Sequence, residues 1–250
     1  MHISQKNTNF ACNFNHYVQN NTIMKTPYEY RAQAREALQE HWGDAAIVSA
    51  IIFAFTLIIS TPSIIGAVNQ SESGGSFTTL LSVLVLPLQY AFYIALLERT
   101  RSNTEGLLQF TWDYIKKEAY AKMRFLVAGL LIIVLSTLLG IITLGIGAII
   151  LEYAYSMVPY ILHDYPELSP REAMKISREM MSGQKWNLFV LDFSFIGWIL
   201  LAILTCGIGT LFVVPYMQTA RAAFYDDLKA ATIVDDTENT IEETTAEEVE

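Results

Sequence analysis

The chain carries little charge and almost no cysteine. Charged side chains make up 16% of its 250 residues, whereas an ordinary soluble domain has roughly 25%. The two cysteines, Cys12 and Cys206, support neither a disulfide framework nor a thiolate metal site. Residues 1–23 are polar and lack the apolar stretch of a cleavable signal peptide, and Met24 is a candidate for the true start of the protein.

The sequence also lacks the common signatures of enzymes. It contains no glycine-rich phosphate loop, no HExxH motif, no Gly-x-Ser-x-Gly elbow and no zinc-ligand spacing. Its basic residues are interspersed with acids, a distribution that suits anionic lipid headgroups better than nucleic acid. We therefore expect no enzymatic activity, no cofactor, no catalytic or metal site and no nucleic-acid partner.

Long apolar runs are abundant instead. Four stretches without a charged residue each reach the roughly 20 residues that a helix needs to cross the hydrocarbon core of a bilayer. They are 45–66, 73–97, 125–151 and 193–220. Four such runs favour a membrane protein over the alternative, a soluble domain with a very apolar core.

Two of these regions are too long for one crossing. From Phe125 to Leu162 the only charged residue is Glu152, and a single helix over those residues would be about 57 Å long. A Thr-x-Gly-Ile-Gly group lies in the middle of this region at 143–147, and a second lies at 205–209 in the next one. Because glycine supplies the positive φ of a tight turn, each group is predicted to join two antiparallel spans. Close helix packing at the paired glycines is the alternative.

The predicted fold is an all-α polytopic membrane bundle of six spans in three hairpins, with both termini in the cytoplasm. The spans are predicted at 45–66, 78–97, 125–142, 146–163, 187–204 and 209–225. In this arrangement all 16 Lys and Arg residues fall on the cytoplasmic side, where short loops of membrane proteins collect positive charge. A four-span alternative, with each glycine group inside one long tilted helix, places adjacent basic loops on opposite sides and loses this agreement.

The two ends of the chain differ from the membrane domain, which is predicted over 25–228. Residues 1–24 form a polar, asparagine-rich leader, and residues 229–250 form a tail whose last part is strongly acidic. Segments of this composition bury too little apolar surface to offset the entropy of ordering the chain. Both ends are therefore predicted to be disordered.

Amphipathic helices are predicted at the membrane surface between the hairpins. Residues 26–38 and 169–181 align without gaps, and each segment begins with the residues of a capping box, Thr26 with Glu29 and Ser169 with Glu172. A third helix, with a weaker capping signal, is predicted within 104–123. Tryptophans suited to the membrane interface accompany the three helices, at Trp42, Trp112 and Trp186. The chain is therefore interpreted as three units, each an interfacial helix followed by a hairpin: 26–98, 104–163 and 169–225, with Pro87, Pro159 and Pro215 in the second spans.

Asp192 and Arg221 are candidate intramembrane polar sites, since charge inside a bilayer is costly. They lie 15 residues before and 14 residues after Gly207, so a hairpin that folds at this glycine places them at the same depth. They are predicted to form an ion pair that joins spans five and six, with a proton or ion relay as the alternative.

Glu152 is the third candidate polar site, and it has no basic residue at its predicted depth. It can snorkel outward, accept hydrogen bonds from Tyr153 or Tyr155, or be protonated by desolvation. A contact with an ion or solute is the functional alternative. His163 and Asp164 lie at the inner boundary and are predicted to be solvated rather than catalytic.

One stretch near the end of the chain carries a family resemblance. The sequence "REMMSGQKWNLFVLDFSFIGWILLAILTCGIGTLFVVPYMQTARAAFY" begins with "REMM", which Ser177 precedes to give "SREMM", and then contains "FSFIGW", "LTCGIG" and "VPY" in order. It resembles the bacterial integral-membrane family catalogued as domain of unknown function 975, and the resemblance extends from about Met24 to Leu228. It implies a polytopic bacterial membrane protein, located in the cytoplasmic membrane, and no established activity, cofactor or catalytic residue.

Two classes of function follow from the sequence. The first is a non-catalytic membrane protein that binds lipids, including anionic headgroups, or partner proteins in the cell envelope. The second is a small transporter or permease, with Glu152 at an ion or solute site between repeated units. The scarcity of unpaired polar groups in the spans favours the first class.

Overall fold

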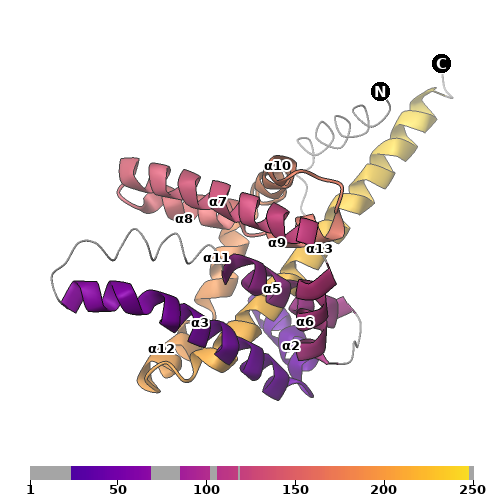
Figure 1. Ribbon diagram of the computed structural model, residues 1–250. Coiled ribbons are helices and arrows are strands. Elements are labelled where there is room, and N and C mark those ends of the chain that lie inside the picture. The colour runs from indigo at the N-terminus through magenta and orange to yellow at the C-terminus, as the bar shows by residue number, and fades with distance from the viewer. Residues whose placement is uncertain (1–23, 69–84, 102–105, 118, 248–250) are drawn as a thin grey trace.

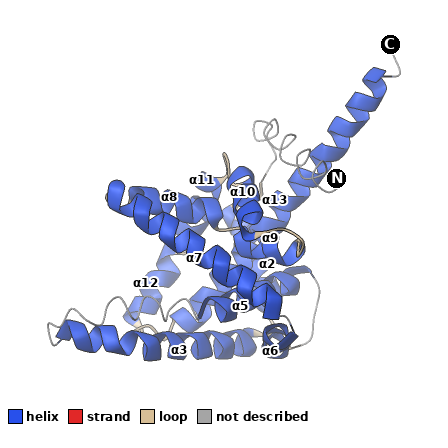
Figure 2. Ribbon diagram, turned by 45° about the horizontal axis from the view of Figure 1, so that its top comes forward, coloured by secondary structure: helices blue, strands red, loops and turns tan. Residues whose placement is uncertain are grey.

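Only helices occur as regular elements in the described part of the chain. The computed structural model describes residues 24–68, 85–101, 106–117 and 119–247, and Figure 2 shows them as helices joined by turns. The helices are α2 (Pro27–Leu38), α3 (Trp42–Val68), α5 (Leu86–Arg101), α6 (Leu107–Lys117), α7 (Ala119–Ile142), α8 (Ile146–Tyr155), α9 (Val158–Asp164), α10 (Pro170–Met180), α11 (Lys185–Phe193), α12 (Ile196–Leu204) and α13 (Thr210–Glu247). The all-α prediction is confirmed for these residues.

Three apolar stretches of helix are long enough to cross a membrane. They are Trp42–Ile59, Met123–Ile142 and Ile146–Asp164, and α11 with α12 makes a fourth if this bent pair is one span. Residues 78–84 of the predicted second span and the leader 1–23 lie outside the described residues. The structure therefore supports a helical protein with several membrane-spanning candidates, and the count of six remains a prediction.

Two of the predicted spans are interrupted. The predicted span 187–204 divides into α11 and α12, which meet at an angle of 41°. At the break, the hydroxyl of Ser194 donates to the carbonyl of Leu191 at 2.6 Å, a local bond that competes with the helix backbone. The predicted span 146–163 divides into α8 and α9 shortly before Pro159, which has no N–H to continue the backbone pattern.

Helix α13 is longer than predicted. It begins at Thr210, close to the predicted start of the sixth span at 209, and continues past the predicted end of that span at 225 to Glu247. No glycine or proline follows Pro215, so the sequence contains no strong helix breaker there. Helix α13 is not among the strongly apolar stretches, because residues 210–227 already include Arg221, Asp226 and Asp227.

Each Thr-x-Gly-Ile-Gly group forms a tight turn between two helices, as predicted. The first glycines, Gly145 and Gly207, have φ values of +93° and +89°. Their N–H groups donate to equivalent carbonyls, Gly145 to Gly140 at 2.7 Å and Gly207 to Ala202 at 2.9 Å. These bonds satisfy carbonyls at the end of the preceding helix. The two turns therefore share one backbone geometry.

The threonine and the second glycine of each group complete the turn. The N–H of Gly147 donates to the hydroxyl of Thr143 at 2.8 Å, and that of Gly209 donates to Thr205 at 2.9 Å. A Cβ added at Gly209 would lie 2.7 Å from the Cα of Ala202. The first glycine therefore makes the turn and the second allows the helices to approach closely, so the two interpretations of the paired glycines both hold.

The predicted capping boxes are confirmed in both aligned amphipathic helices. The N–H of Thr26 donates to the carboxylate of Glu29 at 2.6 Å, and the N–H of Ser169 donates to Glu172 at 2.8 Å. The reciprocal bonds to the threonine and serine hydroxyls are also present. Hydrogen bonds to the backbone and hydroxyl of Ser169 lower the pKa of Glu172 below its usual value, so this carboxylate stays charged. The helix predicted within 104–123 is α6, where the Nζ of Lys116 lies 5.2 Å from the centre of the exposed Trp112 ring.

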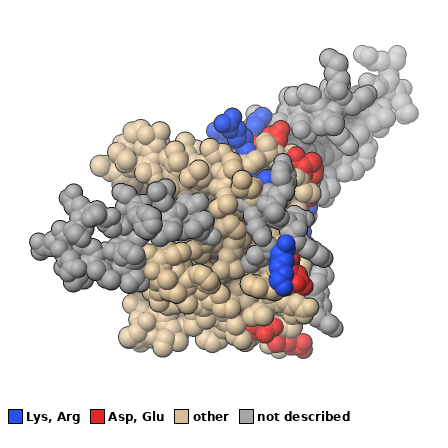
Figure 3. Space-filling view, viewed as in Figure 1, with Lys and Arg blue, Asp and Glu red and all other residues tan. Residues whose placement is uncertain are grey.

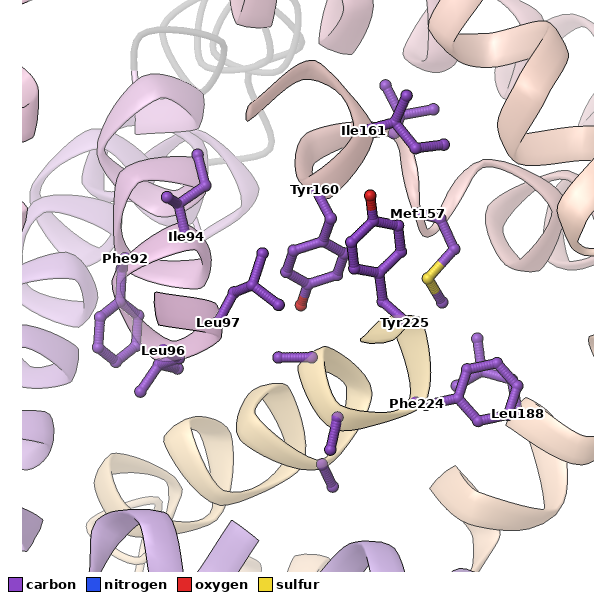
Figure 4. Packing of buried hydrophobic residues seen from close by; sticks show 14 of the residues in the cluster. Phe92, Ile94, Leu96, Leu97, Met157, Tyr160, Ile161, Leu188, Phe224 and Tyr225 are labelled. Atoms are coloured by element: carbon purple, nitrogen blue, oxygen red, sulfur yellow. The ribbon is translucent and has the colours of Figure 1, made fainter. Parts of the chain in front are cut away.

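The core surrounds α13, which runs through the middle of the bundle (Figure 1). It contacts α2, α3, α5, α11 and α12. In Figure 4 the ring of Tyr160 on α9 lies beside Tyr225 on α13, with Leu97 of α5 close by. The two tyrosine rings are stacked with centroids 5.2 Å apart. The buried alanines of α13, Ala220, Ala222 and Ala223, let the neighbouring helices approach its backbone.

The hairpin ends are apolar and exposed. Leu144, in the turn between α7 and α8, is 95% exposed, and Leu204, at the end of α12, is 80% exposed. The charged side chains visible in Figure 3 lie from top to bottom in the half of the view away from the described ends of α7, α8 and α12, and these ends show none in this view. Soluble proteins rarely expose apolar surface of this extent. The arrangement is that of a membrane-associated protein.

Candidate functional site

Asp192 on α11 and Arg221 on α13 form the ion pair that the hairpin predicts. The Nε of Arg221 donates to one carboxylate oxygen of Asp192 at 2.9 Å, and a terminal nitrogen donates to the other at 2.6 Å. The side chains are 24% exposed for Arg221 and 11% for Asp192. A bidentate pair of this kind is among the stronger charge-assisted interactions. It joins the two arms of the hairpin that folds at Gly207.

Aromatic side chains surround this pair. Tyr93 of α5 and Tyr160 of α9 both lie close enough to Arg221 to interact with its charge, and Tyr153 of α8 approaches Asp192. The hydroxyl of Tyr160 is fully buried and has no hydrogen-bond partner among the described residues. The pair is therefore held in a setting of low polarity, where breaking it leaves an uncompensated charge.

Glu152 is not a member of this ion pair, although it lies close enough to Tyr93 and Tyr153 to interact with them electrostatically. It is exposed on α8, and among the described residues no hydrogen bond or ion pair to its carboxylate is present. The hydrogen bonds from Tyr153 and Tyr155 that the sequence allows are therefore not formed. Exposure agrees with outward snorkelling, and the ion or solute contact remains a prediction.

The structure contains a larger charged cluster that sequence reasoning missed, centred on Asp164 at the end of α9. Arg101 of α5 donates to both oxygens of this carboxylate, at 2.7 and 2.8 Å. Tyr225 and Lys229 of α13 donate to it at 3.0 and 2.6 Å. The side chain of Asp164 is only 6% exposed. The prediction that Asp164 is solvated is therefore wrong, because three distant side chains replace the water.

The cluster extends beyond Asp164. Arg101 also donates to Asp226 at 2.6 Å, and burial raises the pKa of Asp226 above its usual value despite this bond. His163 contacts Glu98 of α5 at 3.1 Å. Together these contacts fix the ends of α5 and α9 to the middle of α13. They join residues more than 60 positions apart, so no local spacing in the sequence identifies them.

A groove lies between α7 and the amphipathic helix α10. Its volume is about 360 Å³. One wall is apolar and comes from α7, and the other carries three cations of α10: Arg171, Lys175 and Arg178. The sequence predicts α10 as an interfacial helix, but it does not show that its cations face an apolar helix. This groove is the described place best suited to a ligand with both charge and apolar surface.

Comparison with known proteins identifies a family but no activity. A family model matches residues 67–232, and it describes a protein of unknown function (DUF975). No curated protein and no solved structure matches the chain. The match covers the capping box at Ser169, both glycine turns and the Asp192–Arg221 pair, and it confirms the family resemblance seen in the sequence.

Proposed function

We propose, given that the chain belongs to the DUF975 family of unknown function, that it is a multi-pass membrane protein of the bacterial cytoplasmic membrane. Its interfacial helices and helical bundle bind lipids or partner proteins of the envelope, and it catalyses no reaction. In detail, we propose that the chain crosses the membrane six times, that both termini lie in the cytoplasm, and that the protein helps to organise the membrane.

The distribution of polarity is the observation that carries the proposal. The ends of the hairpins expose leucine and isoleucine, with Ile141 and Leu144 at the tip of α7 and α8. Charged side chains lie instead with the amphipathic helices and with the inner ends of α5, α9 and α13. Such a separation matches a bilayer, with apolar tips in or across the hydrocarbon region and charges at one interface.

A non-catalytic role is supported by how the buried charges are used. Asp192 is neutralised by Arg221, and Asp164 is neutralised by Arg101 and Lys229. Each charge is directed at a partner on another helix rather than at an open cavity. Groups paired in this manner hold helices together, whereas catalytic groups face a substrate.

The transporter alternative depends on Glu152. An ion site inside a bundle needs ligands that enclose the ion, whereas Glu152 is exposed. The groove between α7 and α10 does not include it. The structure thus gives this alternative less support than the lipid-binding or partner-binding function.

Membrane extraction and copurification test the proposal together. We expect the chain to stay in the membrane pellet after alkaline carbonate washing, and to retain lipids or a defined protein partner when purified in mild detergent. Release into the supernatant would contradict a multi-pass protein. Solute flux in proteoliposomes that Glu152→Gln abolishes, with the variant still folded, would instead establish the transporter.

A further inference from the structure

One wall of the groove between α7 and α10 is apolar. This wall is formed by Leu131, Val134, Leu135 and Leu138 of α7. Val134 and Leu138 are each 58% exposed, so the described part of the chain leaves much of this face uncovered. Exposed valine and leucine side chains of this kind are natural neighbours of an acyl chain.

The opposite wall is made by a helix whose orientation is fixed. Ala173, Ser177 and Met180 form the buried face of α10, and the hydroxyl of Ser177 donates to the carbonyl of Ala154 on α8 at 2.9 Å. With this face held against the hairpin, residues spaced three or four positions apart line one flank. Arg171, Lys175 and Arg178 have this spacing, and they line the groove.

The cations of this flank are only weakly neutralised by the protein. Within the described part of the chain, Arg171 and Arg178 form no ion pair, and the 57% exposed side chain of Lys175 lies 3.9 Å from Glu179, at the long limit of an ion pair. The carboxylate of Glu172 accepts a hydrogen bond from the N–H of Ser169 in the capping box. No acidic side chain is found among the described residues that line the groove. The groove therefore combines a surplus of positive charge with an apolar wall.

We propose that this groove is a binding site for an anionic phospholipid. The phosphate group lies against Arg171, Lys175 and Arg178, and an acyl chain follows the apolar wall of α7. Guanidinium groups bind phosphate through paired hydrogen bonds, and basic pockets beside membrane helices hold anionic headgroups. This inference rests on the proposed function, which it narrows from lipids in general to one site and one charge class.

The site is tested with the full-length protein in mild detergent, by native mass spectrometry during titration with phosphatidylglycerol or phosphatidylcholine. We expect the wild-type chain to bind phosphatidylglycerol at least tenfold more tightly than phosphatidylcholine. The triple variant Arg171→Gln, Lys175→Gln, Arg178→Gln is expected to lose at least tenfold in affinity for phosphatidylglycerol. A matched control removes three cations from other surface segments, Arg35→Gln, Lys116→Gln and Lys185→Gln, and is expected to change that affinity less than threefold.

Two further measurements test whether the lipid binds through the charge of α10 and the apolar wall of α7 together. The variant Arg171→Lys, Arg178→Lys keeps the charge and the helix but loses the paired guanidinium hydrogen bonds, and it is expected to bind phosphatidylglycerol more tightly than the triple variant and less tightly than the wild-type chain. Millimolar inorganic phosphate is expected not to displace the lipid, since it has no acyl chain for the α7 wall. Displacement by phosphate, or equal losses in the triple variant and the surface control, would overturn the site.

Failure of this inference is distinguishable from failure of the proposed function. Undiminished phosphatidylglycerol binding by the triple variant, in a chain that still resists carbonate extraction, rejects the groove and leaves a membrane protein. Release of the wild-type chain by carbonate rejects the membrane proposal itself.

Discussion

At the scale of single residues, one ionic contact follows from the sequence and another does not. Asp192 and Arg221 flank Gly207 at nearly equal distances along the chain, so a turn at that glycine is enough to predict their pairing. Asp164 meets Arg101 and Lys229 only because three separate helices converge. That convergence depends on tertiary packing, and the local sequence around Asp164 suggests solvent instead.

The Asp192–Arg221 pair gives a prediction at this scale. Because either charge alone would remain in a setting of low polarity, Asp192→Arg and Arg221→Asp are each expected to destabilise the protein by about 3 kcal/mol or more. The double reversal restores the pair and is expected to recover most of that loss. Thermal unfolding of the purified protein in detergent measures all three variants.

An exposed pair provides the control for this cycle. Lys25 and Asp227 are 2.9 Å apart with side-chain exposures of 43% and 26%, and Lys25→Gln is expected to cost less than about 1 kcal/mol. If the double reversal is no more stable than the single variants, the Asp192–Arg221 contact does not hold the hairpin together.

At the scale of helices and turns, the sequence predicts what depends on local chemistry. The capping boxes at Thr26 and Ser169 and both glycine turns are present as expected. The breaks before Pro159 and at Ser194 were not predicted as helix boundaries, because hydropathy averages over them. The continuation of α13 past 225 was also not predicted, because the span was bounded by hydropathy, whereas a helix ends where a breaker such as glycine or proline stops it and none follows Pro215.

Replacing each of the two glycines of the second turn by alanine is predicted to reduce the stability of the protein by different amounts. Gly207→Ala puts a side chain at a φ of +89° with nothing within 4 Å of the new Cβ, so strain of about 1 to 2 kcal/mol is expected. Gly209→Ala puts a Cβ 2.7 Å from the backbone of Ala202; α12 and α13 must then separate, and we expect a larger loss of thermal stability.

Gly197 supplies the matched control within the same hairpin. It lies in α12 with nothing within 4 Å of an added Cβ, and an alanine there is expected to leave stability unchanged or raise it by up to about 1 kcal/mol. Equal stability of the Gly209→Ala and Gly197→Ala proteins would show that α12 and α13 do not approach as closely as described.

At the scale of the whole molecule, the account depends on how many times the chain crosses the bilayer. The sequence predicts the all-helical class and the family, because both depend on composition and on contiguous motifs. The packing that creates the groove between α7 and α10 and the Asp164 cluster could not be predicted from the sequence. Both features arise between units that the sequence presents only as separate interfacial helices and hairpins.

The central claim is that both glycine turns face the outside of the cell. A cysteine that the chain already carries in one of these turns gives a direct probe of it. Cys206 is an exposed free thiol in the second turn with a φ of +53°, and Leu144 occupies the equivalent place in the first turn with a φ of +52°. Leu144→Cys is therefore a substitution that the turn geometry already accepts elsewhere in the chain. Ser182, exposed in the turn between α10 and α11, serves as the cytoplasmic reference position.

The decisive measurement is labelling of these thiols in spheroplasts with a membrane-impermeant maleimide, one cysteine at a time. Cys206 is tested in a Cys12→Ser chain, and Leu144→Cys and Ser182→Cys are each tested in a chain that also carries Cys12→Ser and Cys206→Ser. The account predicts labelling of positions 144 and 206 in intact spheroplasts and of position 182 only after permeabilisation. Protection of either turn in intact spheroplasts, with labelling only from the cytoplasmic face, would contradict it.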